Sequence, residues 1–517
     1  TSSGYFKNQG VDIMAFDDIY PEGHQGGVCI IMNGHRVATN GDIRLEATPG
    51  QWQPVPKQLD RKLGDNSITA TLCYPDSSRH LTGFNPMIYP DLHLIYTVNV
   101  ESKGKNIEVT VDLDRPIPQE FIGKVGFNLE FFPGSLFGKP WIMDGQSGIF
   151  PQQPNSPLMT TQPNYLHTGN YHDGKQSLAD MDKLIGKGYS PIVADDIISE
   201  PYAKGTKFTS RPDDPYNKVT IESLSGDLQL FDGRMNHNNG WFVLRSNIKP
   251  GVTKGAVKWI ITPNVVADWM YQPVIQTSQI GYHPTQDKEA VIEMDIRDNR
   301  KETAQIIRID ADGEKVVKNV TPANWGKFLR YNYLKVNFTD VKEPGLYKIK
   351  YNTSVSPIFR IDNDVYARGV WQPVLEYFLP VQMCHMRVNE KYRVWHDCCH
   401  MDDAQMAPAH NHIDGYDQKE GLSKFKPGEV VPGVNIGGWH DAGDFDLRIE
   451  SQAGESYILA LAYEAFHPNL DVTSIDQINR VTEIHQPDGK NDLLQQVENG
   501  ALTVVNGYLA LGRLYRG

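Results

Sequence analysis

The sequence predicts a multidomain protein in which two β-rich domains precede a helical region. Its 517 residues exceed the roughly 100–200 residues of one typical domain. Apolar residues alternate with polar ones as far as about residue 270, and they recur with a helical period after Asp362. We therefore expect β-sheet domains first and helices last.

The first domain is expected to be a large all-β sandwich of residues 1–270. Apolar side chains share one face of segment 94–100, and the alternation in segment 107–113 is strict, which is typical of half-buried strands. Residues 150–205 break this pattern, and we interpret them as an insertion or long loop with a short helical patch near 178–185. No cluster of carboxylates or histidines stands out in this domain, so its role stays undetermined.

The second domain is expected to be an immunoglobulin-like sandwich of residues 273–362, since about ninety residues suit that fold. Strands are expected at 291–296 and 347–351, and Asp310-Ala311-Asp312-Gly313 predicts a hairpin turn. The two aspartates of that turn do not predict calcium, because an EF-hand loop has its glycine at the sixth position and here it is the fourth.

The third region, residues 363–517, is expected to be helical. Helices are predicted over residues 364–386, 450–466 and 491–515. Pro373 and Pro380 should kink or interrupt the first of them, and Asn491 is the candidate N-cap of the last.

Composition excludes several classes of partner. Lys and Arg number 50 against 63 Asp and Glu, a net charge of -13, which argues against nucleic acid and anionic membranes and suits a neutral substrate. No segment approaches the ~18 consecutive apolar residues of a membrane helix, so no integral membrane segment is expected. The chain begins at Thr1 without an apolar signal core, so either a signal peptide is already absent or the start is artificial.

A glycine-rich string, Gly437-Gly438-Trp439-His440-Asp441-Ala442-Gly443-Asp444-Phe445-Asp446, precedes the second long helix. In a turn that enters a helix, the side chains of Asp441 and Asp444 can lie together at the mouth of one site. Repulsion between the two carboxylates then raises the pKa of one of them, while the other stays ionised and holds a water. The alternative is that Asp444 or Asp446 only caps the helix, which is the commoner explanation for two aspartates at this spacing. The flanking Gly-Gly-Trp-His makes the string less ordinary.

A second group combines thiols and imidazoles. Its members are Cys384, His385, His396, Cys398, Cys399, His400, His410 and His412. Cysteine and histidine suit zinc, and four protein ligands would make a closed structural site. Buried thiols and surface histidines explain the irregular spacing equally well. A redox dithiol is disfavoured, because no C-x-x-C sequence occurs.

Together these strings resemble the zinc-bearing branch of glycoside hydrolase family 9, the inverting, cellulase-like β-1,4-glucanases. Residues 363–517 resemble the start of its catalytic domain. Residues 273–362, with Gln279-Ile280-Gly281-Tyr282-His283-Pro284 and Glu343-Pro344-Gly345-Leu346-Tyr347, resemble the immunoglobulin-like module that precedes it in one branch. The resemblance implies the first helices of an (α/α)6 barrel, incomplete here.

The resemblance also implies roles for single residues. Asp444 matches the general base, and Asp441 matches the carboxylate that helps to hold the attacking water. The implied ligands of a structural zinc are Cys384, Cys399, His400 and His440. The choice of Cys399 over Cys398 rests only on the adjacent histidine. Calcium is left open as a further ion, although the sequence shows no calcium-binding motif.

The implied function is inverting hydrolysis of β-1,4-glucan-type polysaccharide or oligosaccharide by a secreted, periplasmic or cell-surface enzyme. The general-acid glutamate, late in a barrel of twelve helices in the family, is expected beyond residue 517, so this chain alone is expected to lack it. One alternative is a non-catalytic carbohydrate-binding or scaffold protein with a degenerate or truncated hydrolase domain. Another alternative, a zinc hydrolase, would need an open position on the metal, whereas the four implied ligands close the site. The sequence does not fix the glycan, endo or exo action, or the oligomeric state.

Overall fold

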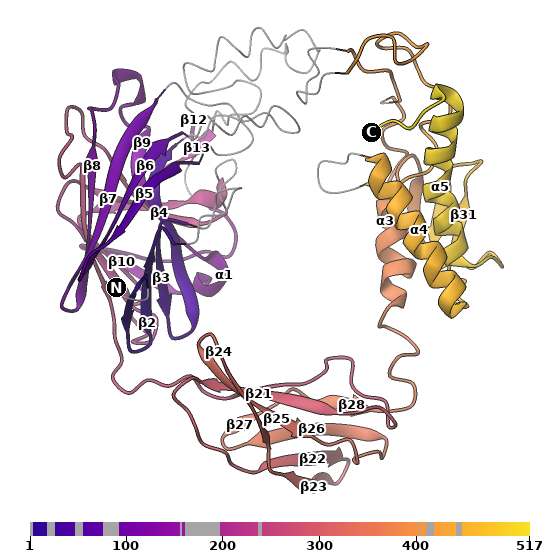
Figure 1. Ribbon diagram of the computed structural model, residues 1–517, viewed down its shortest axis with the longest axis horizontal. Helices are drawn as coiled ribbons and strands as arrows, with labels where there is room; N and C mark the ends of the chain where they lie inside the picture. Colours follow the sequence, from indigo (N-terminus) through magenta and orange to yellow (C-terminus); the bar gives the residue numbers. More distant parts are fainter. Residues whose placement is uncertain are drawn as a thin grey trace. The chain divides into compact units, whose positions relative to one another are not determined.

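The computed structural model (Figure 1) describes residues 4–17, 26–46, 55–75, 92–155, 158–160, 197–235, 240–402, 404–409, 418–440 and 447–516. It forms two compact units that meet in sequence between Tyr271 and Gln272. The protein is mostly β-sheet, as the sequence predicts, and the second unit contains the immunoglobulin-like domain and the longer helices.

The N-terminal unit consists of two large antiparallel sheets. The first sheet contains, in spatial order, β1 (Phe6–Asn8), β2 (Val11–Ala15), β3 (Val28–Met32), β4 (His35–Leu45), β9 (Val125–Phe131), β18 (Phe242–Asn247), β17 (Leu228–Asp232) and β14 (Ala203–Gly205). The second contains β11 (Gln146–Ile149), β10 (Pro140–Met143), β15 (Lys207–Ser210), β16 (Val219–Ser223), β19 (Val257–Pro263), β8 (Asn106–Leu113), β7 (Leu94–Lys103), β6 (Ser67–Tyr74) and β5 (Lys57–Leu63).

Short elements connect or flank these sheets. They are β12 (Leu158–Thr160) paired with β13 (Ile197–Ser199), the 3₁₀ turns η1 (Gln119–Phe121) and η2 (Gly233–Met235), and the one-turn helix α1 (Pro133–Leu136). The helical patch expected near 178–185 lies outside the described residues.

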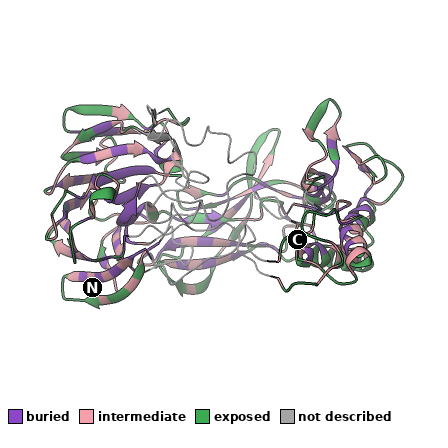
Figure 2. Ribbon diagram, turned by 90° about the horizontal axis from the view of Figure 1, so that it is seen from above, coloured by how far each residue is buried: buried purple, intermediate pink, exposed green. Residues whose placement is uncertain are grey.

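One hydrophobic core lies between the two large sheets. The rings of Phe127 on β9 and Trp259 on β19 meet edge to face with centroids 5.0 Å apart, and the Trp259 indole donates a hydrogen bond to Ser246 on β18 at 3.0 Å. Buried residues alternate with more exposed ones along β6, β7 and β8. Figure 2 shows purple bands of buried residues on strands near the N-terminus. The predicted strands at 94–100 and 107–113 are confirmed by β7 and β8.

The other face of the eight-stranded sheet carries buried charge. On β9, Phe127 and Leu129 belong to the core, so the alternate residues Asn128 and Glu130 point to the opposite face. Both are nevertheless buried, and the side chain of Asn40 donates to Glu130 at 2.5 Å. Burial raises the pKa of Glu130 to about 7, against the opposing effect of the Arg44 charge.

This shift predicts that the N-terminal domain loses stability as pH rises. The pKa of Glu130 is raised to about 7 from the ordinary 4.5, so between these values the folded state binds more protons than the unfolded state. The free energy of unfolding should therefore fall by about 3 kcal/mol across that window. Glu130→Gln keeps the oxygen that Asn40 contacts and removes the charge, so it should flatten the decline.

This effect can be measured by hydrogen exchange of the β9 amides at pH 5 and pH 8. At each pH the measured rate is divided by the intrinsic rate of an unprotected amide, which gives the free energy of opening. Glu222→Gln, on β16 where the carboxylate is 44% exposed, is the matched control and should keep the parental decline. Equal pH dependence in Glu130→Gln and the parent would contradict the prediction.

The immunoglobulin-like domain pairs a sheet of β20 (Val274–Gln276), β21 (Glu289–Asp295), β25 (Tyr331–Asn337) and β24 (Ala323–Phe328) with a second one. The second sheet contains β23 (Gly313–Val320), β22 (Ala304–Asp310), β26 (Gly345–Tyr351), β27 (Ser354–Val355) and β28 (Phe359–Ile361). Asp310 pairs with Gly313, so the predicted hairpin turn is confirmed.

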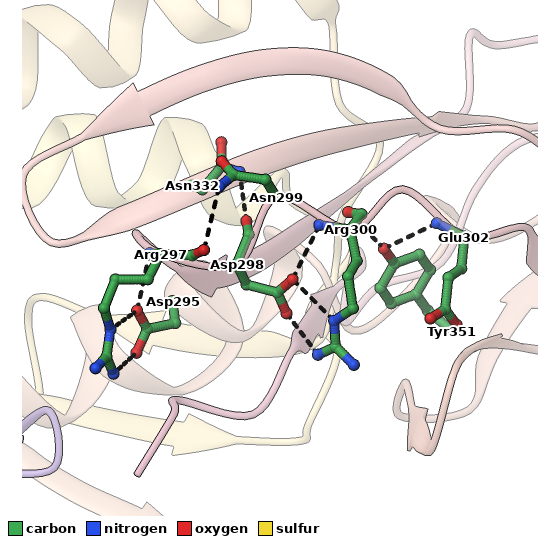
Figure 3. A network of polar contacts seen from close by, with 8 residues as sticks. All are labelled: Asp295, Arg297, Asp298, Asn299, Arg300, Glu302, Asn332 and Tyr351. Atoms are coloured by element: carbon green, nitrogen blue, oxygen red, sulfur yellow. Dashed lines mark hydrogen bonds and ion pairs between the residues drawn. The ribbon is translucent and has the colours of Figure 1, made fainter. Parts of the chain in front are cut away.

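A polar network fixes the connection between the two sheets of this domain (Figure 3). Asp295 and Asp298 each accept hydrogen bonds from the guanidinium two residues further on, at 2.6–2.9 Å. Asn332 of one sheet donates to the backbone carbonyl of Asp298 at 2.7 Å, and Tyr351 of the other donates to that of Arg300 at 3.2 Å. The connection between β21 and β22 is therefore tied to both sheets.

The described residues of the C-terminal region form three helical segments and a small sheet. The helices are a turn of π-helix, η3 (Val374–Phe378), which continues into α3 (Leu379–Gln382), then α4 (Ile449–Phe466) and α5 (Asp492–Leu511). The sheet contains β30 (Arg393–His396), β29 (Arg387–Glu390), β32 (Val481–Ile484) and β31 (Thr473–Asp476).

The helix predicted at 450–466 is confirmed by α4, and the helix predicted at 491–515 is confirmed by α5 except that it ends earlier, at Leu511. The Asn491 side chain accepts hydrogen bonds from the amides of Leu493 and Leu494, as an N-cap does. The helix predicted over 364–386 is wrong at both ends, because regular helix begins only after Pro373 and ends at Gln382. The described residues of this region form the helices α3, α4 and α5, which are too few to test a barrel of twelve helices. The (α/α)6 barrel therefore stays a prediction.

Large apolar side chains are exposed on both long helices. Phe466 of α4 is 81% exposed and Leu509 of α5 is 73% exposed, and Ile458 and Tyr508 are also exposed. These helices therefore present apolar surface that the rest of the described chain does not cover. Among the described helices, none is long and apolar enough to cross a membrane.

Candidate functional site

The structure brings together four of the thiol and imidazole side chains singled out in the sequence. They are Cys384, Cys399, His400 and His440, and their candidate ligand atoms all lie within 4.8 Å of one another. The Cys384 sulfur lies 3.6 Å from that of Cys399 and 3.4 Å from His400 Nδ1. The Cys399 sulfur lies 3.3 Å from His440 Nε2.

These separations fit a tetrahedral zinc site. Zn–S bonds of about 2.3 Å and Zn–N bonds of about 2.0–2.1 Å place two sulfurs about 3.8 Å apart, and a sulfur and a nitrogen about 3.6 Å apart. The donors are two soft thiolates and two borderline imidazoles, the set that zinc favours. Hydrogen bonding with Cys384 is the main cause that lowers the pKa of the Cys399 thiol, against the effect of burial, so Cys399 favours the thiolate form that binds metals.

Two of the chain segments that carry the cluster pair with each other. Cys384 follows α3, and its amide donates to the Gly438 carbonyl at 2.9 Å. The His440 amide donates in turn to the Gln382 carbonyl at 2.8 Å. This antiparallel bridge, centred on Met383 and Trp439, fixes Cys384 and His440 relative to each other.

Residues of α4 and α5 hold the loop that carries His440. Gln452 of α4 accepts from the Trp439 amide at 2.9 Å and donates to the Trp439 carbonyl at 3.0 Å. On α5, Gln496 accepts from the Trp439 indole at 2.8 Å, and Asn499 donates to the Gly438 carbonyl at 3.0 Å. The three side chains are buried, so the backbone just before Asp441 is anchored to both helices.

The conformation of Gly437 is required by this close approach. Its φ is +75°, and a Cβ there would lie 2.2 Å from the Asn499 carbonyl oxygen on α5. A side chain would therefore strain the backbone and push the loop away from the helix.

We expect Gly437→Ala to destabilise the loop by more than the roughly 1–2 kcal/mol of left-handed strain alone, because the clash adds to it. Gly421→Ala is the matched control, since Gly421 has φ +70° and open space around its Cβ position. Zinc retained after dialysis against a chelator, and the melting temperature, measure the effect. Equal behaviour of the two variants would contradict the role given to this contact.

The other thiols and histidines of the sequence group lie elsewhere or play different parts. The sulfur of Cys398 is directed to the Arg480 carbonyl, 3.9 Å away. His385 is buried and bonds the Gly437 carbonyl at 2.9 Å. His396 contacts the backbone of Val381, and a hydrogen bond with Cys399 raises its pKa to about 9. His410 and His412 lie outside the described residues.

Asp441 and Asp444 lie in segment 441–446, outside the described residues. What the structure fixes is the chain on both sides of them, the clamped loop that ends at His440 and the start of α4 at Ile449. Their roles therefore stay as the sequence resemblance gives them.

Sequence reasoning missed the residues that anchor the loop. Gln452, Gln496 and Asn499 are buried amides on two helices. Arg480, in the loop before β32, donates a hydrogen bond to the Asn435 carbonyl at 2.6 Å. The available signal was the three-residue spacing of Gln496 and Asn499, which places two polar side chains on one face of α5.

Comparisons with known proteins support part of this description. Residues 270–356 match the sequence model of the family described as the cellulase N-terminal ig-like domain. The second domain is therefore an immunoglobulin-like domain similar to that of cellulases, as the sequence predicts. No curated protein sequence gives a significant match.

Solved structures give only distant likeness. A zinc-binding triple mutant of the glycoside hydrolase family 9 endoglucanase J30 is 21% identical, with 45% of this chain and 40% of that chain covered and a TM-score of 0.34. A family 9 glycoside hydrolase of Bacteroides ovatus is 19% identical, with 45% and 39% covered and a TM-score of 0.34. The Slr1438 protein of Synechocystis sp. PCC 6803 is 10% identical, with 49% and 91% covered and a TM-score of 0.24. The chain thus spans less than half the length of the two glycoside hydrolases.

Proposed function

We propose that the protein is a secreted or cell-surface glycoside hydrolase, or a part of one, that cleaves β-1,4-glucan with inversion and carries a structural zinc. The observation that carries the proposal is the convergence of Cys384, Cys399, His400 and His440 directly after a domain similar to the N-terminal domain of cellulases. The sequence resemblance of residues 363–517 to the start of a family 9 catalytic domain supports it.

In this proposal a carboxylate oxygen of Asp444 takes a proton from a water molecule, and Asp441 orients that water. The water then attacks the anomeric carbon from the face opposite the leaving sugar. Inversion needs an acid carboxyl about 6.5–9.5 Å from the base, across the scissile bond, to protonate the leaving oxygen. We expect that acid to be a glutamate beyond residue 517.

The zinc would be held by the four protein ligands and would supply a cross-link rather than a reactive centre, because four ligands leave no position for substrate. The zinc would affect catalysis only by fixing the position of the backbone. His440 immediately precedes Asp441, so holding its imidazole fixes where the turn with both aspartates begins. Misplacement of a reacting group by about 1 Å can cost ~10²-fold in rate.

Release of reducing sugar from soluble β-1,4-glucan tests the proposal. It should be measured for residues 1–517 and for the longest natural chain that contains them. We expect turnover in the longer chain and negligible turnover in the shorter one. Turnover in both would mean that a glutamate within residues 1–517 is the acid, which would overturn its expected location.

Absence of turnover in the longest natural chain, with zinc bound and the fold intact, would overturn the hydrolase. It would favour the alternative of a carbohydrate-binding or scaffold protein with a degenerate hydrolase domain.

A further inference from the structure

The N-terminal domain contains a cavity of about 670 Å³ outside its hydrophobic core. This size lies within the roughly 300–1,000 Å³ of small-molecule sites. The side chains that matter for its chemistry are Glu46, Tyr202, Gln229, Phe231, Arg245 and Asn247. Neither the sequence resemblance nor the matched family includes these residues.

Strand alternation places the cavity on the face of the eight-stranded sheet that points away from the core. On β17, Leu228 and Leu230 belong to the core while Gln229 and Phe231 line the cavity. On β18, Arg245 lies directly opposite Gln229 in the antiparallel register. Neighbouring side chains of two paired strands thus form one wall.

A fixed network of hydrogen bonds lies beside this wall. The Arg245 guanidinium is buried and donates to the side chains of Asn128 at 2.7 Å and Asn247 at 2.8 Å. Asn128 donates in turn to the Glu46 carboxylate at 3.1 Å. Burial raises the pKa of Glu46, against the effect of the Arg245 charge. A buried guanidinium is costly for a fold unless it is paired, and charged groups in such surroundings are frequent at binding sites.

The lining determines the class of ligand. Two acidic side chains, Glu46 and Glu200, balance two basic ones, Lys204 and Arg245, so the cavity has no net formal charge to attract an anion or a cation. Amide and carboxylate groups offer both donors and acceptors, and the half-buried ring of Phe231 offers an apolar surface. Sugars combine hydroxyl groups with apolar C–H faces and carry no charge.

We propose that this cavity binds a short neutral oligosaccharide, separately from the glucan-cleaving site proposed at Asp441 and Asp444. The proposed hydrolase activity only suggests which sugars to try first. The N-terminal domain would then hold glycan by its own contacts.

Titration calorimetry of cellobiose, lactose and xylobiose into the intact 517-residue chain tests this proposal. We expect at least one of them to bind. Gln229→Ala removes an amide from the wall, and Glu46→Gln removes a charge while keeping the oxygen that Asn128 contacts, so either should weaken binding about tenfold. Gln276→Ala is the matched control, because Gln276 is exposed on β20 of the immunoglobulin-like domain, and it should bind like the parent.

Three results would overturn the proposal. They are no binding of any neutral sugar, parental affinity in both cavity variants, and preference for glucuronic acid or glucose 6-phosphate over the neutral probes. Since binding is measured without turnover, a chain that fails the hydrolysis assay still tests the cavity. Weakening by Gln229→Ala and Glu46→Gln also separates this binding from occupancy of the glucan-cleaving site.

Discussion

Cys399→Ser is expected to abolish binding of the proposed zinc and to loosen the chain around the four-residue cluster. The Cys399 sulfur lies 3.6 Å from that of Cys384 and 3.3 Å from the His440 ring nitrogen, so its loss removes the donor that contacts both chain segments. We expect zinc affinity to fall by more than the ~10–100-fold typical of changes to groups that only support a ligand. Stability should fall with it, because the metal binds the folded state.

Elemental analysis after chelator dialysis and the melting temperature measure both effects. Cys398→Ser is the matched control, since the adjacent thiol is directed to the Arg480 carbonyl and should be dispensable for zinc. Full zinc retention in Cys399→Ser, or equal loss in both variants, would refute the ligand set. Metal-free protein purified without chelators would refute the zinc itself.

Asp444→Asn is expected to lower glucan turnover by about 10²–10⁴-fold, because it removes the proposed general base while keeping nearly the same shape. The kcat of the longest active natural chain on soluble β-1,4-glucan is the quantity to measure. Zinc content should stay at the parental level, since the change touches none of the four proposed ligands. The first product of the parent enzyme should be the α-anomer by NMR, as inversion at a β-linkage requires.

Asp446→Asn makes the same chemical change two residues further along the chain and should leave kcat near the parental value. A similar loss in Asp446→Asn would show that negative charge in this segment matters in general, not a base at Asp444. A β-anomeric first product would exclude the inverting mechanism and with it the role of Asp444.

Local patterns in the sequence were enough for α5 and the strands β7 and β8, because each has a clear period. The helix α4 was predicted from its content of Ala, Leu and Glu, which are strong helix formers. The helix expected over 364–386 was too long, because apolar spacing continues through Pro373 and Pro380 although the backbone does not remain regular there. The sheet of β29 and β32 escaped prediction. Its strands are four residues long, and their parallel pairing joins residues 94 positions apart, such as Asn389 and Glu483.

The same limit applies to the sites. Cys384, Cys399 and His400 are close in sequence and predicted a metal cluster, but only the family resemblance added His440. The buried charges of the N-terminal domain had no local signature at all. Arg245 meets Asn128 from 117 positions away, and Asn128 meets Glu46 from 82. Such a network exists only once three strands have paired.

The hold of α5 on the loop around Trp439 bears on the order of events during synthesis. The cysteines and His440 leave the ribosome before Gln496 and Asn499, the two α5 side chains that fix this loop. A nascent chain that ends before α5 can offer thiols to a metal ion but cannot yet hold the loop against a helix. We therefore expect secure capture of the proposed zinc ion only late in biogenesis, after the segment around α5 has emerged and folded back.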